Sequence, residues 1–196
     1  MRFFKENSEN IIKLFINQIG IAIFSMFMIL AAYAISDKGG NAAVISIFIS
    51  IFSIIFYFVL IYNVAWEIGA KDKIRIDAGR MEKKESKGIL LGIYSNIPNF
   101  IIIGLAIVLF SIYMIAGGEW LKNIFAILNF IFRFFVSMYL GLIQGITTSI
   151  ANENTAYLVQ SVLFFVFSII SAVVIHVSYI LGLKDFRFFP NAKSAK

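Results

Sequence analysis

The second apolar stretch of this chain, residues 43–68, reads AVISIFISIFSIIFYFVLIYNVAWEI and contains one charged residue, Glu67. A helix needs about 20 predominantly apolar residues to cross a bilayer, so this stretch is long enough for one crossing. Its small and hydroxylated residues recur at steps of three and four, which places them on one helical face. We interpret that face as a packing seam between membrane helices rather than as the wall of a permeation path. The stripe consists of Ser46, Ser50, Ser53, Tyr57, Leu60, Val64 and Glu67.

The whole chain shares this apolar character. Of its 196 residues, 60% are hydrophobic and 14% are charged, whereas a soluble domain is about half apolar and a quarter charged. Too little polar material remains to cover a surface in water. The composition excludes a soluble enzyme, a secreted all-β domain and a disordered chain. It predicts an all-α fold, a polytopic transmembrane helical bundle that forms a single integral membrane domain over residues 1–196.

Apolar stretches of sufficient length predict about five spanning helices. The first stretch contains Ala32-Tyr33-Ala34, which resembles a signal-peptide cleavage site. Its length favours an uncleaved spanning helix instead. The expected spans are residues 14–35, 43–68, 97–116, 119–150 and 157–182.

The third stretch contains an interruption at Asn96-Ile97-Pro98-Asn99. Asparagine is a good N-cap and proline is tolerated in a first helical turn. Residues 88–95 are therefore expected to form a short interfacial segment ahead of the span. A proline kink inside one longer helix is an equal alternative.

The fourth stretch, residues 119–150, is longer than a bilayer requires. Its polar and small residues recur at steps of three and four, which predicts one long, continuous, striped helix. Two crossings broken near Arg133 would each be too short to span. The stripe consists of Lys122, Ala126, Asn129, Arg133, Ser137, Gly141, Gln144 and Thr148.

Lys and Arg residues predict the orientation of the chain. Most of them lie in the N-terminal flank and in a charged loop at residues 70–88. Because basic residues favour the cytoplasmic side, we expect the N-terminus and this loop in the cytoplasm. The abundance of Ile, Phe, Asn and Lys indicates a bacterial source, and hence the bacterial cytoplasmic (inner) membrane. Five spans then place a tail with four basic residues outside, and an even number of spans would remove this conflict. These tail residues are Lys184, Arg187, Lys193 and Lys196.

Arg133 is the residue that most needs an explanation, because a charge near the middle of an apolar stretch is costly. It predicts an anion site or a gating ion pair, a structural pair, or a helix shifted so that Arg133 lies near an interface. Glu67 is the natural acidic partner to test. The candidate intramembrane polar site comprises Arg133, Asn129, Gln144, Asn96, Asn99, His176 and Glu67.

His176 is the one histidine in the chain, and there is no cysteine. One histidine without thiolates or nearby carboxylates does not build a metal site, so a hydrogen-bonded packing role is favoured over a proton relay. The chain also lacks metalloprotease, nucleophile-elbow and P-loop motifs. We therefore expect no catalytic residues, no cofactor and no metal, and the chain is not expected to be an enzyme.

Two G-x-x-x-G spacings occur, at Gly88/Gly92 and at Gly141/Gly145. Such spacings let two helices approach closely. They fit a contact within the fold or a seam in a homo-oligomer, and we favour the contact within the fold.

The charged segment at residues 71–87 mixes both signs, which predicts a solvated helix or an ordered loop. It could dock a cytosolic or membrane partner subunit. No separate basic domain exists, so nucleic acid is not an expected partner; the bilayer is. The candidate docking residues are Lys71, Lys73, Arg75, Asp77 and Arg80.

Two function classes remain open. The first is small-molecule transport, as a permease-like or substrate-binding membrane subunit. In it, Arg133 attracts an anion, and Asn96, Asn99 and Gln144 supply hydrogen bonds near a broken helix. The second is a non-transporting scaffold, assembly or immunity-type protein that acts through residues 71–87.

Overall fold

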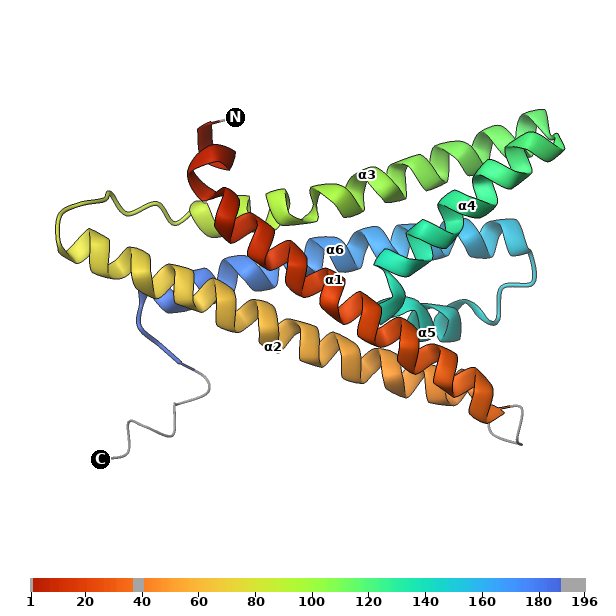
Figure 1. Cartoon of the computed structure of the whole chain (residues 1–196), viewed down its shortest axis with the longest axis horizontal. Helices are drawn as coiled ribbons and strands as arrows, with labels where there is room; N and C mark the ends of the chain where they lie inside the picture. The colour runs from red at the N-terminus through yellow and green to blue at the C-terminus, as the bar shows by residue number, and fades with distance from the viewer. Residues whose placement is uncertain (1, 37–40, 188–196) are drawn as a thin grey trace.

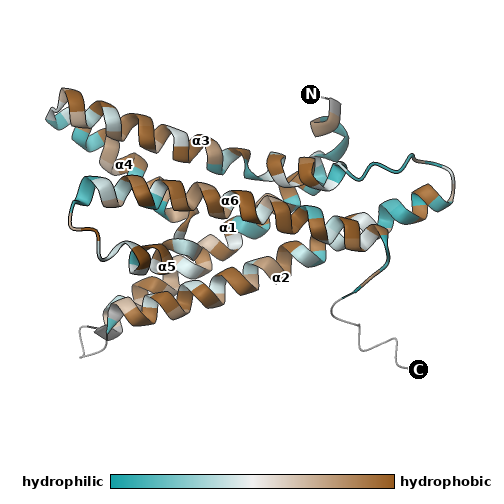
Figure 2. Ribbon diagram, turned by 180° about the vertical axis from the view of Figure 1, so that it is seen from behind, coloured by the Kyte–Doolittle hydropathy of each residue, from teal (hydrophilic) through white to brown (hydrophobic). Residues whose placement is uncertain are grey.

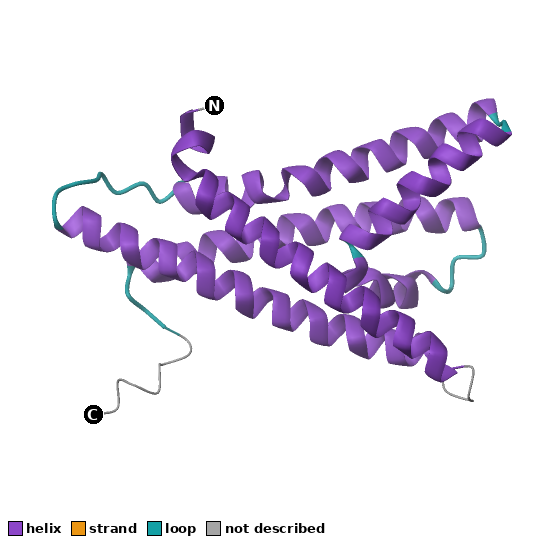
Figure 3. Cartoon of the chain, viewed as in Figure 1, coloured by secondary structure: helices purple, strands orange, loops and turns teal. Residues whose placement is uncertain are grey.

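The structure is a computed structural model that describes residues 2–36 and 41–187. Every regular element among these residues is a helix (Figure 3), which confirms the predicted all-α fold class. The helices are α1 (Arg2–Ser36), α2 (Ala42–Asp77), α3 (Lys87–Ala116), α4 (Glu119–Phe135), α5 (Ser137–Thr147) and α6 (Glu153–Leu183).

Four of the helices, α1, α2, α3 and α6, run along the length of the bundle (Figure 1). The start of α1, the end of α2, the start of α3 and the end of α6 lie together at one end, which we call the terminal end. The opposite end, where α3 is followed by α4 and where α6 begins, is the hairpin end. Both ends of the described chain therefore lie at the terminal end.

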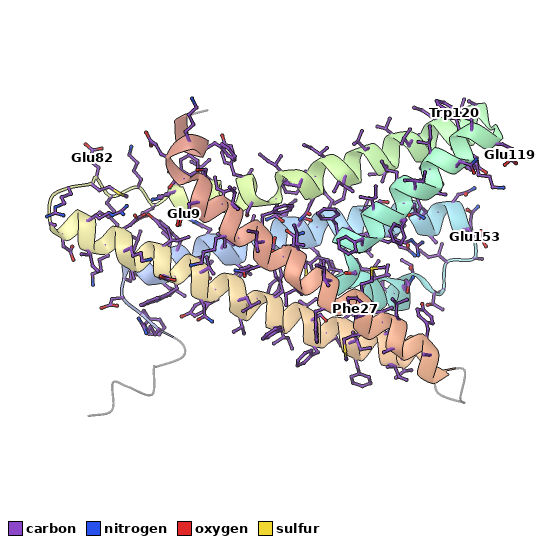
Figure 4. The ribbon with its side chains drawn as sticks, viewed as in Figure 1. Glu9, Phe27, Glu82, Glu119, Trp120 and Glu153 are labelled. Atoms are coloured by element: carbon purple, nitrogen blue, oxygen red, sulfur yellow. The ribbon has the colours of Figure 1, made fainter. Side chains whose placement is uncertain are left out.

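Each of these four helices is long and apolar enough to cross a membrane. Helices α4 and α5 are also long and apolar enough when they are counted together as one span. Most of the length of the four long helices is hydrophobic (Figure 2), and many large apolar side chains on them are exposed. Phe27 on α1 (Figure 4) and Phe48 on α2 are 69% and 68% exposed. Large apolar side chains in such numbers on the outside suit contact with lipid rather than water.

Small residues bring the long helices into close contact. At the terminal end a Cβ atom at Gly69 of α2 would collide with the carbonyl oxygen of Tyr179 on α6. A Cβ atom at Gly92 of α3 would lie 2.7 Å from the carbonyl oxygen of Ala172 on α6. Gly92 belongs to the Gly88/Gly92 spacing. The glycines of the second G-x-x-x-G spacing, Gly141 and Gly145 of α5, face α2. Both spacings thus make contacts within the fold.

The predicted continuous helix over residues 119–150 is wrong. The chain breaks at Val136, where its direction bends by 105° between α4 and α5. The two helices form a V that opens toward the hairpin end (Figure 1). The break has a tertiary cause, because the Ser137 hydroxyl donates to the carbonyl of Ala22 on α1 at 2.7 Å. The Gly141 amide also donates to Ser50 Oγ on α2 at 2.9 Å.

The third apolar stretch also differs from its predicted boundaries. Residues 88–95 do not form a separate segment, because α3 is one helix from Lys87 to Ala116 with Pro98 inside it. The alternative of a single longer helix therefore holds. Proline removes one backbone donor in such a position. On either side of Pro98, the buried side chains of Asn96 and Asn99 hydrogen-bond to each other.

The charged loop predicted at residues 70–88 is shorter than expected. Helix α2 continues to Asp77, so Lys71, Lys73, Arg75 and Asp77 are helical, and residues 78–86 alone connect it to α3. Residues 71–77 therefore match the predicted solvated helix, and residues 78–86 match the predicted loop. In the basic tail, Lys193 and Lys196 lie outside the described residues.

Candidate functional site

Arg133 lines a lateral pocket of about 200 Å³ between α1, α4 and α5. The wall from α1 contains Met26, Ile29, Leu30 and Tyr33. The wall from α4 and α5 contains Phe130, Arg133, Phe134, Ser137, Leu140 and Gln144. The pocket is thus mainly apolar, with a cation, a phenol and an amide among its lining groups. Pockets of this kind are typical of small-molecule sites, although this one is small.

The guanidinium of Arg133 has few partners in this pocket. The side chain is half-buried, and its Nε donates to Asn129 Oδ1 at 3.4 Å, one helical turn earlier. Arg133 makes no ion pair within residues 2–36 and 41–187. A guanidinium carries five N–H donors, and the one side-chain acceptor that Arg133 has among the described residues is Asn129 Oδ1.

The V of α4 and α5 determines where Arg133 lies. Arg133 is in the last turn of α4, directly before the break at Val136. The apex of the V lies within the length of the bundle, away from both ends (Figure 1). Because α5 turns back, Gln144 lines the same pocket as Arg133. Asn129, a third residue of the predicted site, contacts Arg133 but does not line the pocket.

Asn96 and Asn99 lie elsewhere, in a buried hydrogen-bond network around Pro98. Asn99 accepts from Gln18 of α1 at 2.7 Å and donates to Asn96 Oδ1 at 3.0 Å. Asn96 Oδ1 also accepts from Ser171 of α6 at 3.0 Å. Each amide is at most 3% exposed. The two asparagines thus join α1, α3 and α6, and neither lines the Arg133 pocket.

Tyr57 of α2 is buried beside this network, and its hydroxyl lies near Ser171. Gln18, Ser171 and Tyr57 were not among the predicted site residues. Gln18 carried a usable signal, since an amide inside an apolar stretch requires a partner. Ser171 had none, because a serine is common on the faces of membrane helices.

Glu67 and His176 are also separate from the Arg133 pocket. Glu67 pairs with Lys71 at 2.7 Å and with Lys13 at 3.7 Å, near the terminal end. It is therefore not the acidic partner of Arg133. His176 lies against Gly88 of α3, and its Nδ1 is buried with no hydrogen-bond partner among the described residues.

The candidate docking residues do not share one surface. Lys71, Lys73 and Asp77 line a pocket of about 400 Å³ beside Trp66 and Asp185. Lys73 pairs with Asp185 at 3.8 Å. Arg75 lines a different pocket, of about 500 Å³. Arg80 is exposed and lines neither pocket.

Asp72, which was not among the predicted site residues, is a buried anion of the terminal end. It is 2% exposed, and its Oδ2 accepts from Lys87 Nζ at 2.7 Å and from the Tyr179 hydroxyl at 2.9 Å. These contacts join α2, α3 and α6. Across the described residues, no group of three or more His, Asp and Glu side chains is arranged to hold a metal ion.

Comparison with known protein families, with curated proteins and with solved structures finds no match to this chain.

Proposed function

We propose that this chain is a multi-pass protein of the bacterial cytoplasmic membrane and that it serves small-molecule transport, as a permease-like or substrate-binding subunit. Its ligand in this proposal is a small anion with an apolar part, held by Arg133. The observation that carries the proposal is Arg133, which lines a mainly apolar pocket without an acidic partner among the described residues.

The chemistry of the pocket supports this ligand class. A guanidinium presents N–H donors in a planar fork that matches a carboxylate or a phosphate. Tyr33 and Gln144 line the same pocket and can donate further hydrogen bonds. The remaining wall is apolar, and a volume of about 200 Å³ suits a small carboxylate with a short hydrocarbon part. An anion also offsets the cost of a charged side chain at this depth.

The proposed membrane placement follows from the basic residues. We propose that the terminal end is cytoplasmic and that α1, α2, α3 and α6 cross the membrane, with α4 and α5 as a re-entrant pair. Four crossings put the N-terminus, the 78–86 connection and the C-terminal tail on the side where basic residues are favoured. The conflict that five crossings create for the basic tail is then absent.

Ligand-induced thermal stabilisation tests the binding proposal. Purified protein in detergent is titrated with acetate, butyrate, hexanoate and inorganic phosphate, and its melting temperature is recorded. We expect stabilisation that grows with the length of the carboxylate, because a ligand that binds the folded state stabilises it. Arg133→Ala should abolish the shift and Arg133→Lys should weaken it, because lysine lacks the planar fork.

Lys122→Ala is the matched control, since Lys122 is an exposed cation on the same helix. It should leave the shift unchanged. A shift that persists in Arg133→Ala contradicts the proposal, as does the lack of any shift in the unmodified protein.

A second candidate is a scaffold, assembly or immunity-type protein that acts through residues 71–87. It is favoured by the exposure of basic side chains at the end of α2, where the Arg75 side chain is 64% exposed. Loss of the cellular phenotype in Arg75→Ala with Arg80→Ala, but not in Arg133→Ala, would favour this function over transport.

A further inference from the structure

The largest pocket described above, about 500 Å³, lies at the terminal end, at the opposite end of the bundle from the re-entrant pair. Four parts of the chain line it: the start of α1, the end of α2, the connection to α3 and the first turn of α3. Its lining residues are Phe3, Glu6, Asn7, Arg75, Met81, Glu82, Lys84, Ser86, Lys87 and Leu90. Its volume is within the range of about 300–1,000 Å³ typical of ligand sites.

Two cations of this pocket are available to a ligand. Lys84 is exposed and makes no ion pair with a described residue. Arg75 reaches Asp72 at 3.9 Å only, and its side chain is 64% exposed. Lys87 is different, because Asp72 binds it at 2.7 Å and neutralises it.

Backbone donors in the first turn of α3 are already used within the chain, because the Lys87 N–H donates to the carbonyl of Lys84 and the Leu90 N–H donates to the carbonyl of Ser86. Arg75 and Lys84 are therefore the groups of this pocket that suit a phosphate.

Carboxylates line the pocket as well, which argues against a simple anion as the ligand. Glu82 is exposed and makes no ion pair with a described residue, and Glu6 contributes a second carboxylate to the lining. In Figure 4, Glu82 projects from the connection on the side of the bundle where α1 begins. In a ligand that carries both a phosphate and an ammonium group, the phosphate can pair with the cations of the pocket and the ammonium with its carboxylates. A bare phosphate is instead repelled by the carboxylates.

The position of the pocket indicates where such a ligand comes from. Phe3 and Leu90 form apolar parts of the wall, and Phe3 packs on Tyr94 of α3 with 5.5 Å between ring centroids. Farther along α1 and α3, Ile12 and Ile93 are 50% and 42% exposed. The pocket therefore lies where the apolar outer faces of two helices begin, which is the depth of lipid headgroups in a membrane protein.

We propose that this pocket binds the headgroup of a zwitterionic aminophospholipid. Arg75 and Lys84 hold the phosphate, and Glu82 accepts hydrogen bonds from the primary ammonium. The acyl chains lie along the exposed apolar faces of α1 and α3. The inference requires that the chain is in a membrane, but it is independent of the Arg133 site.

Lipid retention measured by native mass spectrometry tests this inference. The full chain in detergent is titrated with phosphatidylethanolamine or phosphatidylglycerol with identical acyl chains, and bound lipid is quantified. We expect phosphatidylethanolamine to bind about tenfold more tightly, a difference of about 1.4 kcal/mol. Glu82→Gln should remove this preference, and Arg75→Ala with Lys84→Ala should weaken the binding of both lipids.

Glu119→Gln and Lys122→Ala are matched controls, because they change charges at the hairpin end. Both should bind the lipids as the unmodified protein does. Equal or tighter binding of phosphatidylglycerol overturns the inference, and so does a preference that survives Glu82→Gln. Soluble phosphoethanolamine is the remaining arm: if it binds as tightly as the lipid, the ligand is a soluble molecule and the lipid assignment is wrong.

Discussion

Asp72 has a structural role that its position in the sequence does not reveal. Its carboxylate is buried and binds the ammonium of Lys87 and the hydroxyl of Tyr179. One side chain thereby connects the consecutive helices α2 and α3 to α6, which is distant in the sequence. Breaking a buried ion pair from one side leaves the other charge without a partner, which costs more than removing both partners.

The residue-scale prediction is that Asp72→Ala destabilises the protein by about 3 kcal/mol or more, the size typical of a buried pair broken on one side. The Lys87 side chain is 12% exposed, so it cannot easily reach water without a rearrangement of the terminal end. The double variant Asp72→Ala with Lys87→Ala should be less destabilised than the sum of the two single variants. Thermal unfolding in detergent measures all four proteins, and additive effects would contradict the pairing.

The short helix α5 depends on contacts that a side chain would block. At Gly141, an added Cβ would collide with the backbone carbonyl of Ser46 on α2. At Gly145, one turn later, it would meet only the end of the flexible Ile47 side chain, at 2.7 Å. The same helix therefore offers a severe and a mild version of the same substitution.

At the element scale, Gly141→Ala should displace α5 from α2 and lower stability by about 1–3 kcal/mol, the usual cost of overpacking. Gly145→Ala should cost less, because Ile47 can change its rotamer. Unfolding midpoints of the two variants check the order. Equal effects, or a larger effect at Gly145, would show that the close contact between α5 and α2 does not hold the V in place.

The whole molecule places both ends of its described chain at the same end of the bundle (Figure 1). This arrangement results from the V of α4 and α5, which leaves and returns to the hairpin end. It leads to four proposed crossings with cytoplasmic termini.

The whole-molecule prediction concerns the sides of the membrane. The chain contains no cysteine, so a thiol reagent can label only the single cysteine that is introduced. Ala151→Cys at the hairpin end should react with an impermeant thiol reagent in intact cells, and Ala78→Cys at the terminal end should react only after lysis. A reporter fused to the C-terminus should be active in the cytoplasm. A C-terminal reporter outside the cell would instead support five crossings, with α4 and α5 as one bent span.

The periodic stripe of α2 was predictable from the sequence because it is local. Ser46, Ser50 and Ser53 are at most 3% exposed, as expected for a packing seam. Helical geometry alone places residues three and four apart on one face, and in an apolar helix that face is the one that packs against other helices.

The candidate site was predictable only in part. Arg133 and Gln144 line one pocket and Asn129 contacts Arg133. Asn96 and Asn99 belong to a separate network, and Glu67 pairs with lysines. A polar residue in an apolar stretch indicates that it needs a partner, and it does not indicate which one. That partner depends on how the helices are arranged.

The sequence by itself determined an all-α bundle, because the apolar stretches are long and their polar residues follow a helical period. It could not determine the break at Val136. No proline or glycine occupies that position, and the stripe from Lys122 to Thr148 has the same spacing whether the helix continues or bends. Contacts of Ser137 with α1 and of Gly141 with α2 decide it. These depend on residues more than 90 positions away in the chain, so only the tertiary structure brings Gln144 and Arg133 to one pocket.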